Sequence, residues 1–295
     1  MARGKTIQLY LMDSVSKGLI KCTLANWTGI AYKIPRTELE KAKSIDYLKQ
    51  SGVYFLFSTS DETQENIVYI GQAGTRKNGE GILNRLQEHK RNPDKDYWTE
   101  AVAFTTTNNT FGPTEISYLE NQFTKLAIDS KRYIVKNSNE PSLGHVTEEK
   151  ESELEEYIDY AKIVIGALGY RIFEPIIESP EIITTVLAPT PEPLLSLILN
   201  QGKKEKIIAH GKQTNEGFVI LKGSKIKSST VKSVPTKALK DRKRANLDDN
   251  FVLLEDMLFN SPSSAASFVT GYAINGKDAW KDEQGRSLNE IEKLE

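Results

Sequence analysis

The 295-residue sequence has one cysteine and three histidines, which limits the kinds of site it can build. Because Cys22 is the single cysteine, the chain cannot form an internal disulfide, and a reducing, cytoplasmic location is expected. The histidines His89, His145 and His210 lie far apart along the chain. This separation argues against a zinc site made of cysteine and histidine.

Long hydrophobic runs are also absent from the sequence. The longest apolar segment, residues 163–170, is well short of the roughly 20 residues that cross a bilayer. The first residues show no extended apolar core and no small-residue cleavage site, so no signal peptide is expected. We therefore expect a protein without a membrane partner.

Net charge is nearly absent, since the formal value is −1 at pH 7. This value argues against a uniformly basic nucleic-acid-binding protein. The average conceals two opposite segments: residues 141–200 contain eleven acids and three bases, and residues 203–244 contain thirteen bases and three acids. A basic block of this size attracts polyanions at long range, although such runs also form ordinary solvated surface.

The hydrophobic pattern predicts an α+β protein with four regions. Strands and helices are expected over 1–50 and over 51–140. An acidic helix and a proline-rich linker are expected over 141–202. A second small α+β domain is expected over 203–295. The linker itself, 179–193, contains four prolines and breaks the periodicity.

Local periodicity places the expected elements within these regions. Strands are expected at 6–12, 29–34, 52–57, 67–71, 101–107 and 216–226. Helices are expected at 37–50, 82–90, 114–128, 147–168 and within 250–272. The strands at 52–57 and 67–71 are joined by a polar connection, which predicts an antiparallel hairpin with a long loop.

Each strand of this hairpin contains a tyrosine close to a glycine. Gly52 comes two positions before Tyr54, and Tyr69 comes two positions before Gly71. A tyrosine in a strand is most often a packed, half-buried aromatic, so neither residue is informative alone. Their meaning depends on the polar residues of the helices that follow.

Three polar residues occupy informative positions on these helices. Arg85 and His89 are four residues apart in the helix over 82–90 and share one face. Glu120 lies close to the apolar face of the helix over 114–128, where a lone acid is usually a surface residue. Beside an arginine and two phenols, this carboxylate becomes a candidate metal ligand.

These residues, in this order, resemble the GIY-YIG endonucleases. Gly52-Val53-Tyr54 resembles the first triplet of that family, with valine for isoleucine, and Tyr69-Ile70-Gly71 resembles the second after a somewhat longer gap. The helix arginine and helix glutamate of the family match Arg85 and Glu120. The family asparagine matches Asn137 or, alternatively, Asn139. The ends of the chain are similar to a bacterial subfamily whose uncharacterised C-terminal domain is similar to RAMA modules, which are associated with restriction and methylation systems.

The resemblance implies the GIY-YIG nuclease fold over 51–140, in which helices flank a small antiparallel sheet, with residues 1–50 packed on it as a strand and helix extension. It also implies a metal-dependent endonuclease that hydrolyses phosphodiester bonds in DNA. Its setting would be restriction, repair or mobile-element biology. Glu120 would hold Mg²⁺ (or Mn²⁺), and Arg85 would bind phosphate oxygens. Tyr54 or Tyr69 would be the general base, with a pKa lowered by the arginine and the metal. His89 would compete for that role or donate a hydrogen bond to phosphate, and both alternatives stay open.

Further residues are expected to support the site or to contact DNA. Gly52 and Gly71 would let the phosphate backbone approach closely, and Asn137 would support the site. Contacts to DNA are expected from Arg76, Lys77, Lys222, Lys225, Arg242, Lys243 and Arg244. One nuclease centre cuts one strand per visit, so double-strand cutting would call for a homodimer or two sequential events.

Two other classes of protein are compatible with the sequence. The first is a nucleic-acid-binding or regulatory protein whose GIY-YIG domain is catalytically silent. The intact set of Tyr54, Tyr69, Arg85 and Glu120 argues against it. The second is a structural interaction protein that uses the acidic helix over 147–168 as a partner surface, and no chemical feature supports it.

Overall fold

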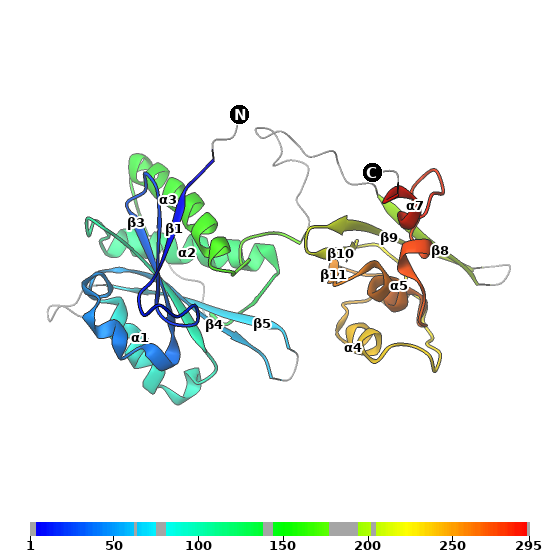
Figure 1. Ribbon diagram of the computed structural model, residues 1–295, viewed down its shortest axis with the longest axis horizontal. Coiled ribbons are helices and arrows are strands. Elements are labelled where there is room, and N and C mark those ends of the chain that lie inside the picture. Colours follow the sequence, from blue (N-terminus) through cyan, green and yellow to red (C-terminus); the bar gives the residue numbers. More distant parts are fainter. Residues whose placement is uncertain are drawn as a thin grey trace. The chain divides into compact units, whose positions relative to one another are not determined.

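The computed structural model describes residues 4–61, 64–74, 81–137, 144–176, 194–201 and 205–293. The chain forms two compact units, an N-terminal unit over Arg3–Pro175 and a C-terminal unit over Ile176–Glu295 (Figure 1). Each unit combines a β-sheet with helices, so the chain belongs to the mixed α/β classes that the α+β expectation describes in general terms. No helix of the described residues has the length and apolarity to span a membrane.

The N-terminal unit is built on a seven-stranded sheet with strand order β1-β2-β3-β6-β4-β5-β7. The strands are β1 (Ile7–Leu11), β2 (Ile20–Leu24), β3 (Gly29–Pro35), β4 (Gly52–Thr59), β5 (Asn66–Ala73), β6 (Glu100–Thr106) and β7 (Ile134–Val135). The observed sheet is therefore larger than the expected small antiparallel sheet. One of its strand pairs, β5 with β7, is parallel. The sheet is larger because β3 pairs with β6 over seven residues, so residues 1–50 extend the sheet itself.

Helices cover both faces of this sheet: α1 (Ile82–Arg91) lies on one face, and α2 (Pro113–Ser130) and α3 (Glu148–Ala167) lie on the other (Figure 1). The alternation of β4 explains this arrangement, because successive side chains of a strand point to opposite faces. Phe55 and Phe57 pack in the hydrophobic cluster that contains α2 and α3. Tyr54 and Leu56 pack in the cluster that contains α1. The acidic helix α3 is thus part of the N-terminal unit.

Residues 37–50 do not form the expected α-helix but three short 3₁₀ turns. These are η1 (Arg36–Glu38), η2 (Lys41–Ser44) and η3 (Asp46–Lys49). The buried apolar residues of the segment are Leu39, Ala42, Ile45 and Leu48, each three positions after the last. A repeat of three matches the 3₁₀-helix, in which residues i and i+3 eclipse, whereas the wider stripe of an α-helix mixes spacings of three and four.

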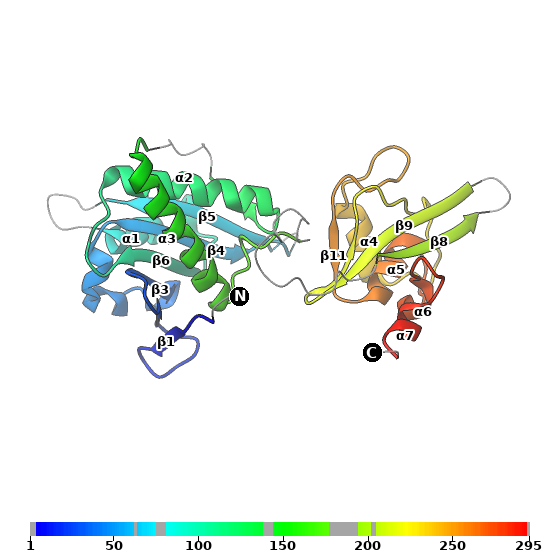
Figure 2. The ribbon, with the colours of Figure 1, turned by 90° about the horizontal axis from the view of Figure 1, so that it is seen from above.

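The C-terminal unit contains a four-stranded antiparallel sheet with strand order β11-β10-β9-β8. Its strands are β8 (Leu195–Gln201), β9 (Glu205–Thr214), β10 (Gly217–Ile220) and β11 (Met257–Phe259), and its helices are α4 (Thr236–Arg244), α5 (Pro262–Thr270), α6 (Gly276–Ala279) and α7 (Leu288–Ile291). Strands β8 and β9 form a long ribbon (Figure 2). The strand expected at 216–226 ends at Ile220, and β8 begins inside the region expected as linker. The proline-rich segment 179–193 lies outside the described residues.

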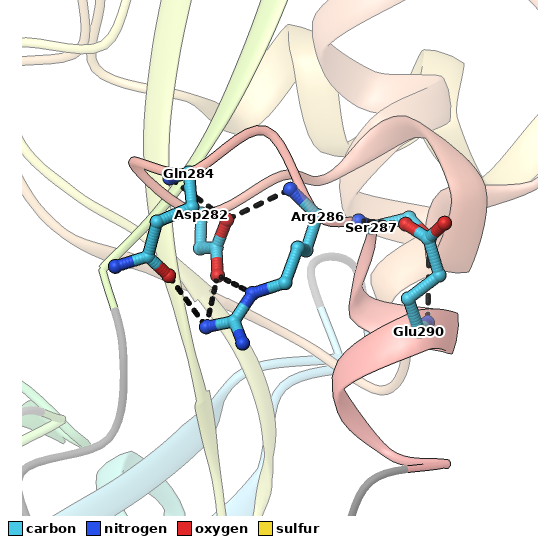
Figure 3. Close-up of polar contacts among 5 residues, drawn as sticks. All are labelled: Asp282, Gln284, Arg286, Ser287 and Glu290. Atoms are coloured by element: carbon cyan, nitrogen blue, oxygen red, sulfur yellow. Dashed lines mark hydrogen bonds and ion pairs between the residues drawn. The ribbon is translucent and has the colours of Figure 1, made fainter.

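Aromatic residues and local polar contacts hold this second unit together. Trp280 packs on Phe218, with ring centroids 4.6 Å apart, and its Nε1 donates to the Pro262 carbonyl at 3.0 Å. Before α7, the Asp282 carboxylate accepts the backbone N–H groups of Gln284 and Arg286 and the Arg286 Nε–H (Figure 3). The Ser287 and Glu290 side chains then close a capping box at the start of α7 (Figure 3). These contacts fix the turn in a segment that has little core of its own.

Candidate active site

The register of the β4–β5 hairpin places Tyr54 directly opposite Gly71. A Cβ atom built at Gly71 would overlap the Tyr54 hydroxyl group and ring, so only glycine leaves room for this phenol. Gly52 is equally crowded, because a Cβ there would overlap the Phe104 carbonyl and the Ile82 side chain. The expectation that these two glycines open space for a phosphate backbone is therefore wrong: contacts within the protein already occupy that space.

A buried hydrogen bond joins the first tyrosine to the histidine of α1. The distance between Tyr54 Oη and His89 Nε2 is 2.7 Å, and the two residues are 0% and 3% exposed. Burial, Lys95 and Arg85 together lower the pKa of His89 to about 4. The imidazole is therefore neutral near pH 7, and its unprotonated nitrogen can accept the Tyr54 O–H.

Tyr69 completes an aromatic triangle with these two residues. Its ring centroid lies 5.4 Å from that of His89 and 6.4 Å from that of Tyr54. Tyr69 is half-buried, whereas Tyr54 has no exposed surface. Burial raises the pKa of both phenols, and this effect outweighs Arg85, which lowers the pKa of each. Arg85 alone therefore does not lower the pKa of either phenol below its ordinary value, and both groups are protonated near neutral pH. The expectation that a metal ion lowers a phenol pKa stays a prediction.

Arg85 links the phenols to an open pocket. Hydrogen bonding to Glu88, at 2.6 Å from Nη1 to Oε2, raises the pKa of Arg85, as does hydrogen bonding to Tyr54. A pocket of about 220 Å³ adjoins this guanidinium. Its walls come from the end of β5 and the start of α1: Gln72, Ala73, Gly74, Gly81, Asn84, Arg85 and Glu88. The pocket therefore leaves open space beside the Arg85 side chain.

Glu120 of α2 is half-buried beside the same hairpin. Burial raises the pKa of this carboxyl, while hydrogen bonding to Gln72 and the charges of Arg85 and Lys95 lower it. No group of three or more His, Cys, Asp or Glu side chains suited to a metal appears among the described residues. A single carboxylate still fits Mg²⁺, which often binds one or two protein carboxylates and completes its shell with water and substrate phosphate oxygens.

Asn137 holds the second triplet in place from the neighbouring segment. Its Oδ1 accepts the Ile70 N–H at 3.1 Å, and its Nδ2 donates to the Ile70 carbonyl at 2.8 Å. In this way the Asn137 side chain extends the pairing of β7 with β5 beyond the last pair of backbone partners, Val68 and Val135. Asn137 thus supports β5 next to Tyr69, while Asn139 lies outside the described residues.

Sequence reasoning missed Lys95, which the structure places over the second tyrosine. Lys95 ends the 3₁₀ turn η4 (Pro93–Lys95), and its Nζ lies 3.2 Å from the centroid of the Tyr69 ring. No spacing in the sequence indicates this contact, because it depends on the direction in which the chain turns after α1. The Asn92-Pro93 dipeptide is the one local signal, since it predicts a turn at that point.

The residues predicted to contact DNA have different environments. Arg76 and Lys77 lie outside the described residues. Arg242 is wrongly predicted as a DNA contact, because its guanidinium donates to the carbonyls of Lys227, Phe268 and Val269 at 2.7–3.0 Å. The others belong to the C-terminal unit: Lys222 and Lys243 are exposed, Lys225 is half-buried, and Arg244 pairs with Asp241 at 3.1 Å.

Comparison with known proteins identifies one matching region. Residues 199–292 match the family model of a domain of unknown function, DUF4357. The match covers most of the C-terminal unit and does not reach β4, β5, α1 or α2. Neither a curated protein nor a solved structure matches the chain. The DUF4357 match carries no activity with it, so a function has to be argued from the chemistry of the site.

Proposed function

We propose that the N-terminal unit is a divalent-metal-dependent DNA endonuclease that hydrolyses phosphodiester bonds. The observation that carries this proposal is the convergence of Tyr54, Tyr69, His89, Arg85 and Glu120 from four elements, β4, β5, α1 and α2. The rings of Tyr54, Tyr69 and His89 lie 5.4–6.4 Å apart, and Arg85 and Glu120 shift the pKa values of both phenols, so the five groups are neighbours. The resemblance to GIY-YIG endonucleases, noted from the same residues, gives the reaction class.

The guanidinium of Arg85 supplies the phosphate-binding group. It is a planar fork of N–H donors that matches two phosphate oxygens, and hydrogen bonding to Glu88 and Tyr54 holds its charge and direction. Glu120 would hold Mg²⁺ or Mn²⁺ through its carboxylate, with the Gln72 amide beside it. The cation, when bound, supplies Lewis acidity toward the phosphate and the departing alkoxide.

We propose different roles for the two phenols, on the basis of their exposure and hydrogen bonding. Tyr69 is the more exposed, so its oxygen can accept a proton from the attacking water. Hydrogen bonding connects Tyr69 to Tyr54, and the Tyr54 hydroxyl reaches His89 Nε2 at 2.7 Å. These hydrogen bonds would hold the Tyr69 ring in place, and the charges of Arg85 and of a bound cation would favour the phenolate that accepts the proton.

A plasmid-nicking assay in Mg²⁺ or in EDTA tests the proposal. Wild-type protein is expected to nick DNA only with Mg²⁺, and Glu120→Ala is expected to lose about 100-fold or more of this rate while keeping its fold by circular dichroism. Asp129→Ala is the matched control, because Asp129 is an exposed acid on the same helix. Cleavage by Glu120→Ala at the wild-type rate would remove Glu120 from the site. DNA binding without cleavage by the wild type would favour the catalytically silent alternative.

We extend the proposal to the C-terminal unit as a second DNA-binding surface. Residues 222–244 contain nine bases and one acid, whereas residues 245–293 contain nine acids and four bases. The inner face of α4 is fixed by the buried Ala238 and by the three hydrogen bonds of Arg242. The exposed outer face carries Lys237, Lys240 and Lys243. Lysines on an anchored helix match phosphate contacts, whose strength falls with salt.

A further inference from the structure

The turn that ends α1 returns the chain toward the active-site hairpin. The Asn92 backbone N–H donates to the Glu88 carbonyl at 3.1 Å, and its side chain accepts the Asp94 N–H at 2.9 Å. Pro93 lacks an N–H and disfavours helical geometry at the residue before it, so α1 cannot continue. The short 3₁₀ turn that follows ends at Lys95, whose side chain lies over β5.

The ammonium group of Lys95 lies in a half-buried position beside the candidate site. It is 3.2 Å from the Tyr69 ring centroid, and among the described residues no carboxylate lies within ion-pair distance of it. The aromatic face attracts the cation, while the nearby charge of Arg85 repels it. Burial and Arg85 lower the pKa of Lys95 to about 8, and the charge of Glu120 opposes part of this change.

Arg85 and Lys95 are two cations whose charges act on the same carboxylate, that of Glu120. Arg85 also borders the pocket between β5 and α1. The Glu120 carboxylate offsets only one of these two positive charges, so a further anion is still attracted to them. A phosphodiester group has the charge and the oxygen geometry to bind both cations, since it can accept the fork of an arginine and the point charge of a lysine on different oxygens.

We propose that Lys95 is a substrate-contacting residue that binds a non-bridging oxygen of the phosphodiester held by Arg85. Its stacking on Tyr69 also fixes the ring of that tyrosine, so phosphate binding and orientation of the phenol are coupled through one side chain. This inference rests on the proposed nuclease function for the identity of the anion. The contact itself rests on the position of Lys95 in the structure.

The test compares Lys95→Gln and Lys95→Arg with Arg91→Gln in the full chain. Arg91 is an exposed cation at the end of α1, so its loss gives the same charge change outside the site. Cleavage of a short duplex in Mg²⁺ gives kcat and KM, and fluorescence anisotropy of the same duplex in EDTA gives Kd. We expect Lys95→Gln to lower kcat/KM by about 100-fold, in the range seen when a donor to a reacting group is removed. Lys95→Arg should recover part of the loss, and Arg91→Gln should stay within about twofold of wild type.

The outcomes separate this inference from the proposed function. Wild-type kcat/KM in Lys95→Gln, with active wild-type enzyme, overturns the role of Lys95 and leaves the nuclease proposal intact. An inactive wild type overturns the nuclease proposal. In that case the Kd values from anisotropy still test whether Lys95 contacts the phosphate. Equal Kd values for wild type and Lys95→Gln would overturn the phosphate contact. A loss of activity in Lys95→Gln that arginine does not rescue, together with a lowered Tm, would show that Lys95 is only structural.

Discussion

At the scale of single residues, the fit of Tyr54 against Gly71 makes a sharp stability prediction. Gly71→Ala is expected to destabilise the protein by about 1–3 kcal/mol, because the new methyl group overlaps a buried phenol that has no room to move. Gly74→Ala is the control, since its methyl would lie 3.7 Å from its nearest neighbour, Ile116. Urea unfolding of the two variants measures the difference. Equal stabilities would contradict the packing described here.

His89 gives a prediction about pH. Its pKa is about 4 in the folded protein against an ordinary value of about 6.5, so the unfolded chain binds more protons between these values. Stability from this residue is present above about pH 6.5 and is lost as the pH falls toward 4. We expect wild type to lose about 2 kcal/mol more than His89→Gln between pH 7 and pH 4.5, as measured by urea unfolding. Parallel losses in the two proteins would mean that His89 is not held neutral by its site.

The residues of the site differ in how far the sequence can predict them. Tyr54, Tyr69, Arg85, Glu120 and Asn137 can be found because they follow the known order of a family, and His89 because it lies one helical turn after Arg85. The contact of Lys95 with Tyr69 and the hydrogen-bond partner of Asn137 could not be found in this way. They depend on the turn at Pro93 and on the parallel pairing of β7 with β5, which join residues distant in sequence.

At the scale of elements, helix α4 carries the prediction about DNA binding. Lys237→Gln, Lys240→Gln and Lys243→Gln, made together, are expected to weaken DNA binding and to reduce the slope of log K against log salt by about 2–3. The control replaces Lys206, Lys281 and Lys293, which are exposed and lie on other segments of the same unit. Fluorescence anisotropy at several salt concentrations, in EDTA, gives the slope. The same slope in both triple variants would rule out α4 as the contact surface.

The elements also show where periodicity succeeds and where it fails. The β4–β5 hairpin and helices α1, α2 and α3 can be predicted because their burial patterns are local and long. The recurring apolar residues of 37–50 predict a helix. Their spacing is three residues throughout, however, and the chain forms 3₁₀ turns. Arg242 is predicted as a DNA contact, although its position one turn after the buried Ala238 indicates the inner face of α4.

At the scale of the whole molecule, the division into two compact units predicts separable functions. A chain shortened to residues 1–176 retains the sheet, helices α1 to α3 and the candidate site. We expect it to fold, to nick DNA in Mg²⁺ and to bind DNA more weakly, with a smaller salt slope than the full chain. Circular dichroism, plasmid nicking and anisotropy measure these three properties. Unchanged affinity and slope would contradict a DNA-binding role for the C-terminal unit.

The contact between Tyr54 and Gly71 also has a consequence for how such sequences diverge. The ring and the space that receives it lie on two strands, so a mutation at either position is constrained by the other. In a set of related chains, side chains larger than hydrogen at position 71 should occur only where the aromatic ring at position 54 has been lost. Substitutions in the two triplets would then be correlated. Active lineages would keep both triplets, and inactive lineages would lose both.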